Sequence, residues 1–179
     1  MEPSISAGDH QSYMSYCLTL AQKSPPKPTN YRVGALLLDA SQNTILATGY
    51  TLELPGNTHA EQCCFLKLLE KHNLPQDSED RLAEVLPQNT ILYTTVEPCG
   101  KRLSGNLPCV ERILKIGKGG DGKGGIKKVY VGVKEPEKFV GENVGRQKLE
   151  GAGIEVVLVE GLEEEILKVA TAGHVEEKA

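Results

Sequence analysis

The chain has 179 residues, of which 39% are hydrophobic and 25% are charged, and its net charge at pH 7 is −4. This length fits one globular domain with a sizeable core, and we expect that domain to span residues 1–179, with residues 1–8 as a loose N-terminus. The acidic balance argues against a nucleic-acid partner, because a phosphate backbone is usually bound by a basic face. No apolar run approaches the roughly 20 residues of a membrane span, and the N-terminus lacks the basic start and apolar core of a signal peptide.

Five cysteines occur in the chain, namely Cys17, Cys63, Cys64, Cys99 and Cys109. An odd number in a chain of this length argues against a disulfide framework. Reduced thiols are typical of a reducing compartment, so we expect a cytoplasmic protein, with the nucleus as the alternative. We expect Cys17, Cys63 and Cys64 to act as small buried hydrophobic side chains.

Hydrophobic periodicity predicts helices and strands that alternate along most of the chain. The predicted helices cover residues 9–23, 59–72, 109–116, 142–150 and 162–172. The predicted strands cover residues 31–39, 44–50, 90–96, 127–133 and 154–160. This alternation indicates an α/β fold, and we expect a three-layer α/β/α sandwich around a five-stranded mixed sheet. The first two strands should form an antiparallel hairpin, whereas the later strands follow helical crossovers and should run parallel.

The Gly-rich segment 117–125 resembles a phosphate-binding loop at first sight. The P-loop pattern requires Ser or Thr after its lysine, and neither Lys118 nor Lys123 is followed by one. The composition therefore favours a flexible surface loop.

A metal-binding pattern joins His59, Cys99 and Cys109, which supply one imidazole and two thiols. These are ligands that Zn²⁺ prefers, and a catalytic zinc site keeps its fourth position open for water. Glu61 lies two residues after His59, and an H-x-E followed by P-C and a second cysteine is the signature of zinc-dependent base deaminases. The usual second half is P-C-x-x-C, but here nine residues, 100–108, separate the two cysteines.

This pattern predicts hydrolytic deamination of an amino-heterocycle with one zinc ion per chain. Zinc can lower the pKa of a bound water to about 7, and we expect Glu61 to carry a proton from that water to the substrate. The two cysteine-bearing segments and the His59 helix should meet at the carboxyl ends of the strands, where open α/β sheets bind ligands. Glu97 and Pro98 precede Cys99, and they either support this ligand or act as a solvated charge and a turn residue.

The segments His59-Ala60-Glu61, Glu97-Pro98-Cys99 and Pro108-Cys109 resemble the cytidine/deoxycytidylate deaminase superfamily. Within it, the chain is most similar to the deaminases of riboflavin biosynthesis. Their bacterial members carry N-P-x-V-G before the first strand and a long loop before the last cysteine; here residues 30–34 read N-Y-R-V-G and the loop is one residue longer. The run over residues 49–63 resembles the fungal branch in particular, and the similarity covers residues 10–160.

The resemblance implies the fungal substrate, 2,5-diamino-6-ribitylamino-4(3H)-pyrimidinone 5′-phosphate, whose 2-amino group is replaced by oxygen with release of ammonia. Bacterial relatives act on the ribosylamino compound and are usually fused to a reductase, for which this chain has no length left. We therefore expect a stand-alone deaminase. The resemblance also implies a homodimer.

Substrate contacts are likewise implied by the resemblance. Asn30 should hydrogen-bond the pyrimidine, and Asn57, Thr58 and Ala60 should line the floor near the zinc. The loop that begins with Gly100, Lys101 and Arg102 should close over the ribityl phosphate, with the two cations as phosphate ligands or as ordinary solvated loop residues. Leu52 stands where bacterial members tend to have a substrate-contacting histidine, which suggests a role in choosing the linear ribityl chain.

Two other interpretations fit part of the pattern. The chain could deaminate cytidine, deoxycytidylate or adenosine in tRNA, but such relatives generally use the short P-C-x-x-C spacing. It could also hold a structural zinc ion, which normally has four protein ligands, and Cys63 or Cys64 would then be the fourth.

Overall fold

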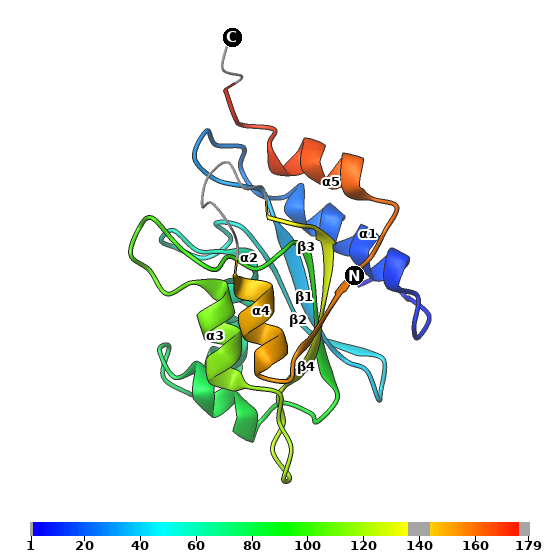
Figure 1. Ribbon diagram of the computed structural model, residues 1–179, viewed down its shortest axis with the longest axis vertical. Coiled ribbons are helices and arrows are strands. Elements are labelled where there is room, and N and C mark those ends of the chain that lie inside the picture. Colours follow the sequence, from blue (N-terminus) through cyan, green and yellow to red (C-terminus); the bar gives the residue numbers. More distant parts are fainter. Residues whose placement is uncertain (1, 136–143, 176–179) are drawn as a thin grey trace.

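The computed structural model describes residues 2–135 and 144–175, and its centre is a five-stranded sheet in the order β2-β1-β3-β4-β5. Figure 1 shows helices on both faces of this sheet. The strands are β1 (Gly34–Asp39), β2 (Thr44–Tyr50), β3 (Thr90–Val96), β4 (Ile126–Val133) and β5 (Glu155–Leu158). The helices are α1 (His10–Ala21), α2 (Ala60–Lys71), the 3₁₀ helix η1 (Glu79–Glu84), α3 (Cys109–Ile116), α4 (Gly145–Gly151) and α5 (Glu163–Ala170). The predicted fold class is therefore confirmed.

The pairing of the strands follows the prediction with one refinement. β1 and β2 form the expected antiparallel hairpin, and β3, β4 and β5 are mutually parallel. The refinement is that β3 pairs with β1, antiparallel. The crossover through α2 therefore makes β3 parallel to β2, but β1 lies between them. This order leaves the carboxyl ends of β3 and β4 at the same edge of the sheet.

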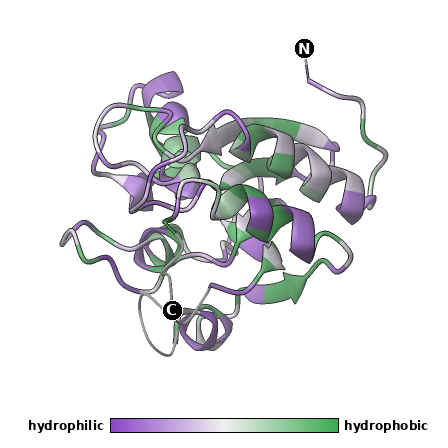
Figure 2. Ribbon diagram, turned by 90° about the horizontal axis from the view of Figure 1, so that it is seen from above, coloured by the Kyte–Doolittle hydropathy of each residue, from purple (hydrophilic) through white to green (hydrophobic). Residues whose placement is uncertain are grey.

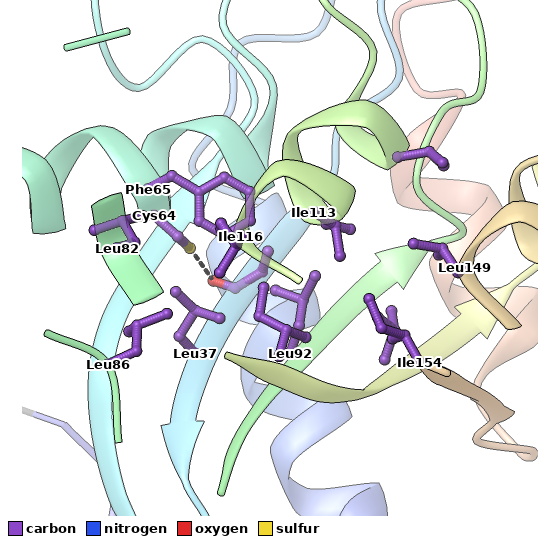
Figure 3. Close-up of a cluster of buried hydrophobic side chains, with 14 of the residues drawn as sticks. Leu37, Cys64, Phe65, Leu82, Leu86, Leu92, Ile113, Ile116, Leu149 and Ile154 are labelled. Atoms are coloured by element: carbon purple, nitrogen blue, oxygen red, sulfur yellow. Dashed lines mark hydrogen bonds between the residues drawn. The ribbon is translucent and has the colours of Figure 1, made fainter. Parts of the chain in front are cut away.

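Two hydrophobic clusters lie on opposite faces of the sheet, because alternate residues of each strand point to opposite sides. Leu37 of β1 packs into the cluster under α2, α3 and α4, whereas Leu36 packs into the one under α1. Figure 3 shows the first cluster, in which the Cys64 thiol is 3.6 Å from the carbonyl oxygen of Ala35. Figure 2 shows the hydrophilic residues gathered on the loops and the outer sides of the helices. Burial on both faces explains why β1 reads as an apolar run from Gly34 to Leu38.

Two glycines allow helices to approach the sheet more closely than a side chain would permit. A Cβ at Gly34 would lie 1.8 Å from the carbonyl oxygen of Cys17 in α1. A Cβ at Gly49 in β2 would lie 2.3 Å from the carbonyl oxygen of Ala60, in the first turn of α2. Gly49 therefore helps to set the position of the start of α2, which carries the residues of the predicted metal site.

The Gly-rich segment 117–125 lies between α3 and β4. It forms a small hairpin closed by Gly120 and Lys123, and the amide of Gly124 donates to the carbonyl oxygen of Ala83. It projects from the end of the sheet opposite to the loop between β3 and α3 (Figure 1). The base of the hairpin therefore contacts η1, and the flexibility of the segment stays a prediction.

The remaining differences from the sequence prediction are small. The first helix ends at Ala21 rather than at residue 23, and β1 begins at Gly34 rather than at residue 31. In the N-terminal segment, the carbonyl oxygen of Ile5 accepts a hydrogen bond from the side chain of Asn43. The start of the helix predicted over 142–150 lies outside the described residues. Within the described part of the chain, none of the helices has the length and apolar character that crossing a membrane requires.

Candidate active site

Three predicted metal ligands meet at the carboxyl edge of the parallel strands. His59 is the residue immediately before α2, Cys99 follows β3 after a short extended segment, and Cys109 is the first residue of α3. The loop between the two cysteines is closed at its base, because Val110 donates its amide to the carbonyl oxygen of Cys99. The amide of Cys109 also points at the Cys99 sulfur, at 3.3 Å. Two helix N-termini therefore direct partial positive charge at the site, which favours thiolates.

The geometry of these three residues fits a tetrahedral zinc ion. His59 Nδ1 lies 3.5 Å from Cys99 Sγ and 3.5 Å from Cys109 Sγ. Usual zinc bond lengths and a tetrahedral angle would place such a nitrogen and sulfur about 3.6 Å apart. Among the described residues, the cluster joins these three side chains and no fourth ligand. This count is typical of a catalytic zinc site, which keeps one position open, and it weighs against a structural site with four protein ligands.

The other cysteines take the roles expected of them. Cys17, Cys63 and Cys64 are buried and reduced. Burial raises the pKa of Cys17 and of Cys64 far above the usual thiol range. These thiols therefore stay protonated and uncharged at neutral pH.

The two thiols of the cluster behave as an acid–base pair. A hydrogen bond from Cys109, together with the neighbouring His59, lowers the pKa of Cys99 to about 4. The same hydrogen bond, with burial and the Glu61 charge, raises the pKa of Cys109. The metal-free pair therefore holds one negative charge, on Cys99, with the proton on Cys109. Binding of a divalent cation would release that proton, since a metal-bound thiol is deprotonated.

Glu61 lies in the first turn of α2 and is almost completely buried. Its Oε2 is 3.5 Å from Cys109 Sγ, and its Oε1 accepts a hydrogen bond of 2.9 Å from Thr94 Oγ1. Burial raises the pKa of the Glu61 carboxyl, and the nearby charge of Cys99 raises it further. A buried carboxyl group beside the ligand cluster is placed to move a proton to and from a bound substrate, as a proton shuttle requires.

Thr94 is a site residue that the sequence analysis missed. Its hydroxyl can also donate to the carbonyl oxygen of Val96, at 3.0 Å. When Glu61 is ionised, Thr94 donates to it; when Glu61 is protonated, Thr94 can accept from it and donate to Val96 instead. Thr94 can therefore hold Glu61 in place in both protonation states. The sequence gives no signal that distinguishes Thr94 from the other threonines of this strand, Thr90 and Thr95.

A cavity of about 200 Å³ opens above this cluster. His59, Glu61 and Cys99 form its floor. Its walls come from the residues before β1, after β2, and after β3 and β4. Of the predicted substrate-binding and supporting residues, those that line it are Asn30, Asn57, Lys101, Arg102 and Glu97. Leu103 and Ser104, which also line the cavity, belong to the loop that was expected to close over the substrate. The further lining residues, which the sequence does not single out, are Thr29, Tyr31, Val33, Thr51, Val96 and Glu135.

Four residues that were considered for substrate contacts are not among the described residues of the cavity lining. Thr58 and Ala60 are buried, and the Thr58 hydroxyl donates to the carbonyl oxygen of Leu54. Gly100 is half-buried between Cys99 and Lys101, and its amide hydrogen-bonds the Glu135 carboxylate. Leu52 adopts a left-handed backbone conformation, with φ of 64°, and its amide donates to the carbonyl oxygen of Thr58. Leu52 therefore does not line the part of this cavity that the described residues form.

Asn30 and Asn57 face one another at the mouth of the cavity. The Asn30 Nδ2 donates to Asn57 Oδ1 over 3.1 Å. The backbone oxygen of Asn30 is 2.9 Å from His174 Nε2, and this contact links the segment after α5 to this wall. Lys101 is exposed, whereas Arg102 is buried against Asn57. The two cations that the sequence treats as a pair therefore occupy different environments.

Two carboxylates, Glu97 and Glu135, form the opposite wall. The Glu135 amide donates to Glu97 Oε2 at 3.3 Å, and the Gly100 amide hydrogen-bonds the Glu135 carboxylate. Burial and the negative charges of Cys99, Glu97 and Glu61 raise the pKa of Glu135 to about 8. Pro98 is buried between the end of β3 and Cys99. Glu97 thus supports the cavity wall beside the loop between Cys99 and Cys109, through its contact with the backbone of Glu135.

Comparison with known proteins gives consistent results. A protein of Schizosaccharomyces pombe named diaminohydroxyphosphoribosylamino-pyrimidine deaminase is 34% identical over 166 residues, which are 93% of this chain and 36% of that protein. The riboflavin biosynthesis protein RibD of Bacillus amyloliquefaciens is 31% identical over 145 residues, 80% of this chain and 32% of that protein. The chain thus spans about a third of the length of these curated relatives.

Crystal structures of the Rib2 deaminase of Aspergillus oryzae, a C-terminal deletion mutant, resemble the chain over most of their length. The structure at pH 4.6 has a TM-score of 0.82 and 52% identity, over 92% of each chain. The same deaminase in complex with DARIPP has a TM-score of 0.80 and 51% identity, over 92% of this chain and 91% of that one. Residues 7–120 match the family described as the cytidine and deoxycytidylate deaminase zinc-binding region. With its His/Cys/Cys cluster inside the matched region, the chain belongs to the cytidine and deoxycytidylate deaminase family.

Proposed function

We propose that this protein is a zinc-dependent hydrolase of riboflavin biosynthesis that deaminates 2,5-diamino-6-ribitylamino-4(3H)-pyrimidinone 5′-phosphate. The observation that carries the proposal is the His59, Cys99 and Cys109 cluster with the buried Glu61 carboxyl beside it, at the floor of a cavity. The similarity to the Rib2 deaminase over 92% of both chains favours this pyrimidine phosphate over the substrates of other members of the family.

In this reaction water adds to C2 of the pyrimidine, the C2–N bond breaks, and ammonia leaves. A zinc ion held by His59, Cys99 and Cys109 would supply an activated water at neutral pH. Glu61 takes one proton from the attacking water and delivers it to a ring nitrogen, and it then carries the second proton, from the new hydroxyl group on C2, to the departing amine. Its raised pKa suits both directions of transfer, and Thr94 keeps the carboxyl aimed at the reacting atoms in either protonation state.

Recognition of the substrate is assigned to the walls of the cavity. The amide of Asn30 has an acceptor and a donor for the edge of the ring. The exposed ammonium of Lys101 is available for the phosphate, since among the described residues it has no ion-pair partner. Glu97 and Glu135 present acceptors to amino and hydroxyl groups from the other side.

The test is ammonia release by purified, zinc-loaded protein from the ribitylamino and ribosylamino pyrimidine phosphates, with cytidine and deoxycytidylate as controls. We expect release from the ribitylamino compound. Turnover of cytidine or deoxycytidylate alone would refute the substrate and leave only the zinc chemistry. The Glu61→Gln variant should keep its zinc and lose roughly 10²- to 10⁴-fold in kcat, the usual contribution of a positioned acid–base group. Full activity of this variant would rule out the proton-shuttle role.

We also propose that the protein is a homodimer and resides in the cytoplasm. Both assignments are based on the family resemblance and on the use of reduced cysteines as ligands. Light scattering that finds only a species of the chain mass, 19.4 kDa, would exclude the dimer. Fluorescence microscopy of the tagged protein in cells tests the location, and a signal confined to the nucleus would contradict it.

A further inference from the structure

The loop between Cys99 and Cys109, residues 100–108, is called the ligand loop below. Arg102 is the one buried residue in its stretch 101–107. Its exposed fraction is 9%, whereas that of the next residue, Leu103, is 81%. A guanidinium group is costly to bury unless its donors find acceptors. The acceptors that Arg102 finds all belong to the start of α2 and the segment just before it, so the side chain crosses from the ligand loop to the segment that carries His59.

The two arms of the guanidinium group have separate partners. Nη1 donates to Gln62 Oε1 over 3.1 Å, and Nη2 donates to the backbone oxygen of Asn57. Gln62 Oε1 also accepts the backbone amide of His59, at 3.2 Å. A continuous chain of hydrogen bonds therefore runs from the loop between the two cysteine ligands, through Arg102 and Gln62, to the backbone of the histidine ligand.

The same side chain also fixes the mouth of the cavity. Asn57, whose backbone oxygen binds Arg102, holds the Asn30 side chain through its own Oδ1. Both partners of Arg102 are neutral, and no carboxylate lies within ion-pair distance of it among residues 2–135 and 144–175. The contacts are those of a planar fork bridging two acceptors, which lysine cannot reproduce with a single ammonium group.

We propose that Arg102 is a positioning residue that latches the zinc-ligand loop onto the start of α2 and thereby holds the three ligands at their metal-binding spacing. It is not the phosphate ligand that its place beside Lys101 suggests. The phosphate contact from this loop then falls to Lys101, whose side chain is exposed. The inference rests on the proposed function only for the role of Lys101, because the latch concerns the ligand cluster itself.

The decisive measurement is the rate at which a chelator removes zinc, which requires no substrate. Arg102→Gln should speed metal release roughly 10- to 100-fold, as is usual when a group that orients metal ligands is lost. Lys101→Gln is the matched control, because it removes the same charge from the neighbouring position, and its release rate should equal that of the wild type. Equal release rates for Arg102→Gln and the wild type would overturn the latch. Circular dichroism should confirm that both variants are folded at the temperature used.

A conservative variant separates the shape of the side chain from its charge. Arg102→Lys keeps the positive charge but cannot bridge Gln62 and Asn57 in the same way, so its release rate should lie close to that of Arg102→Gln. Wild-type behaviour of Arg102→Lys would show that a point charge is sufficient and would refute the two-acceptor latch. In a double-mutant cycle, Arg102→Gln combined with Gln62→Ala should accelerate release by less than the product of the single effects, because both changes break one chain. Multiplicative effects would argue against that chain.

Steady-state kinetics then compare the two cations with the ribitylamino pyrimidine as substrate, with and without its phosphate. Arg102→Gln should lower kcat by a similar factor for both compounds. Lys101→Gln should raise KM for the phosphorylated compound only. If instead Arg102→Gln raises KM for the phosphorylated compound alone, Arg102 is a phosphate ligand and the latch is wrong. If neither pyrimidine is turned over even by the wild type, the proposed substrate fails, while the chelator experiment still decides the latch.

Discussion

The floor of the cavity is built from the ends of regular elements, whereas its mouth is built from loops. On the floor, His59 and Cys109 are held at the starts of two helices, and Glu61 is buried within the first turn of α2. At the mouth, Asn57 and Lys101 are exposed and depend on contacts between segments that are far apart in the sequence. The candidate reaction chemistry therefore depends on the ends of helices, whereas substrate choice depends on contacts between loops. Changes at the floor should affect metal binding and kcat, and changes at the mouth should affect pH dependence and KM.

The largest effect should follow from removing a ligand at the floor. Cys109→Ser should lose most of its zinc and more than roughly 100-fold of its activity, because even the loss of a supporting group behind a metal ligand costs 10- to 100-fold. Metal content by mass spectrometry and ammonia release check this. Cys63→Ala is the matched control, since Cys63 is as fully buried as Cys109 but lies outside the cluster. Retention of zinc by Cys109→Ser, with its loss from Cys63→Ala, would restore the structural-site interpretation.

A smaller effect should come from the hydroxyl that holds Glu61. Thr94→Val removes a buried hydrogen bond to a charged group, worth about 1.5–3 kcal/mol, and should lower kcat by roughly 10- to 100-fold. The neighbouring Thr95→Val is the control, because Thr95 is equally buried but its hydroxyl accepts the amide of Gly34. The control should be destabilised yet keep its kcat. If the two variants have the same kcat, Thr94 has no special link to the reaction.

Next in size is a change to the packing that positions α2. Gly49→Ala places a Cβ against the carbonyl oxygen of Ala60 and should lower the free energy of unfolding by about 1–3 kcal/mol. Because the strain falls on the first turn of α2, metal release should also accelerate. Urea unfolding and chelator kinetics measure the two effects. Gly151→Ala, where a Cβ meets open space, should change stability by less than about 0.5 kcal/mol. A tolerated Gly49→Ala would mean that α2 can shift without disturbing the ligands.

The smallest effect on turnover belongs to the mouth, where the change concerns the pH dependence of stability. Glu135 has a pKa of about 8 in the fold, against a usual value of 4.5. Between these values the folded state binds more protons than the unfolded state, so the free energy of unfolding falls as pH rises from about 4.5 to 8. Glu135→Gln should remove part of that slope and should be more stable than the wild type above pH 8.

The metal provides a further check on this prediction. The difference in slope between the wild type and Glu135→Gln should be larger in zinc-free protein, because a bound dication offsets the charge of Cys99 that contributes to the shift. Unfolding curves at a series of pH values, with and without zinc, test it. Parallel pH profiles for the two proteins would show that Glu135 is not the source of the slope.

Much of the floor could be predicted from the sequence, because it depends on local signals. The spacing of His59 and Glu61 and the cysteine that begins α3 are visible as short motifs, and β3 is visible as a segment rich in β-branched and aromatic residues. The mouth could not be predicted in the same way. Arg102 and Lys101 are adjacent cations in the sequence, yet one is buried and the other exposed. Only the position of α2 relative to the loop decides which of them finds acceptors.

Glu135 and Thr94 illustrate the same limit. Thr94 is one of several polar residues in a strand, and only the pairing of that strand beneath α2 brings its hydroxyl to Glu61. Glu135 follows β4, and the parallel pairing of β3 and β4 brings its backbone to Glu97. By itself, the sequence determined which side chains form the candidate metal cluster, the place of Glu61 beside it and the order of helices and strands, because those depend on spacing and hydrophobic period. The tertiary structure alone decided the burial and partners of each charged group at the mouth, because those depend on which distant segments the sheet brings together.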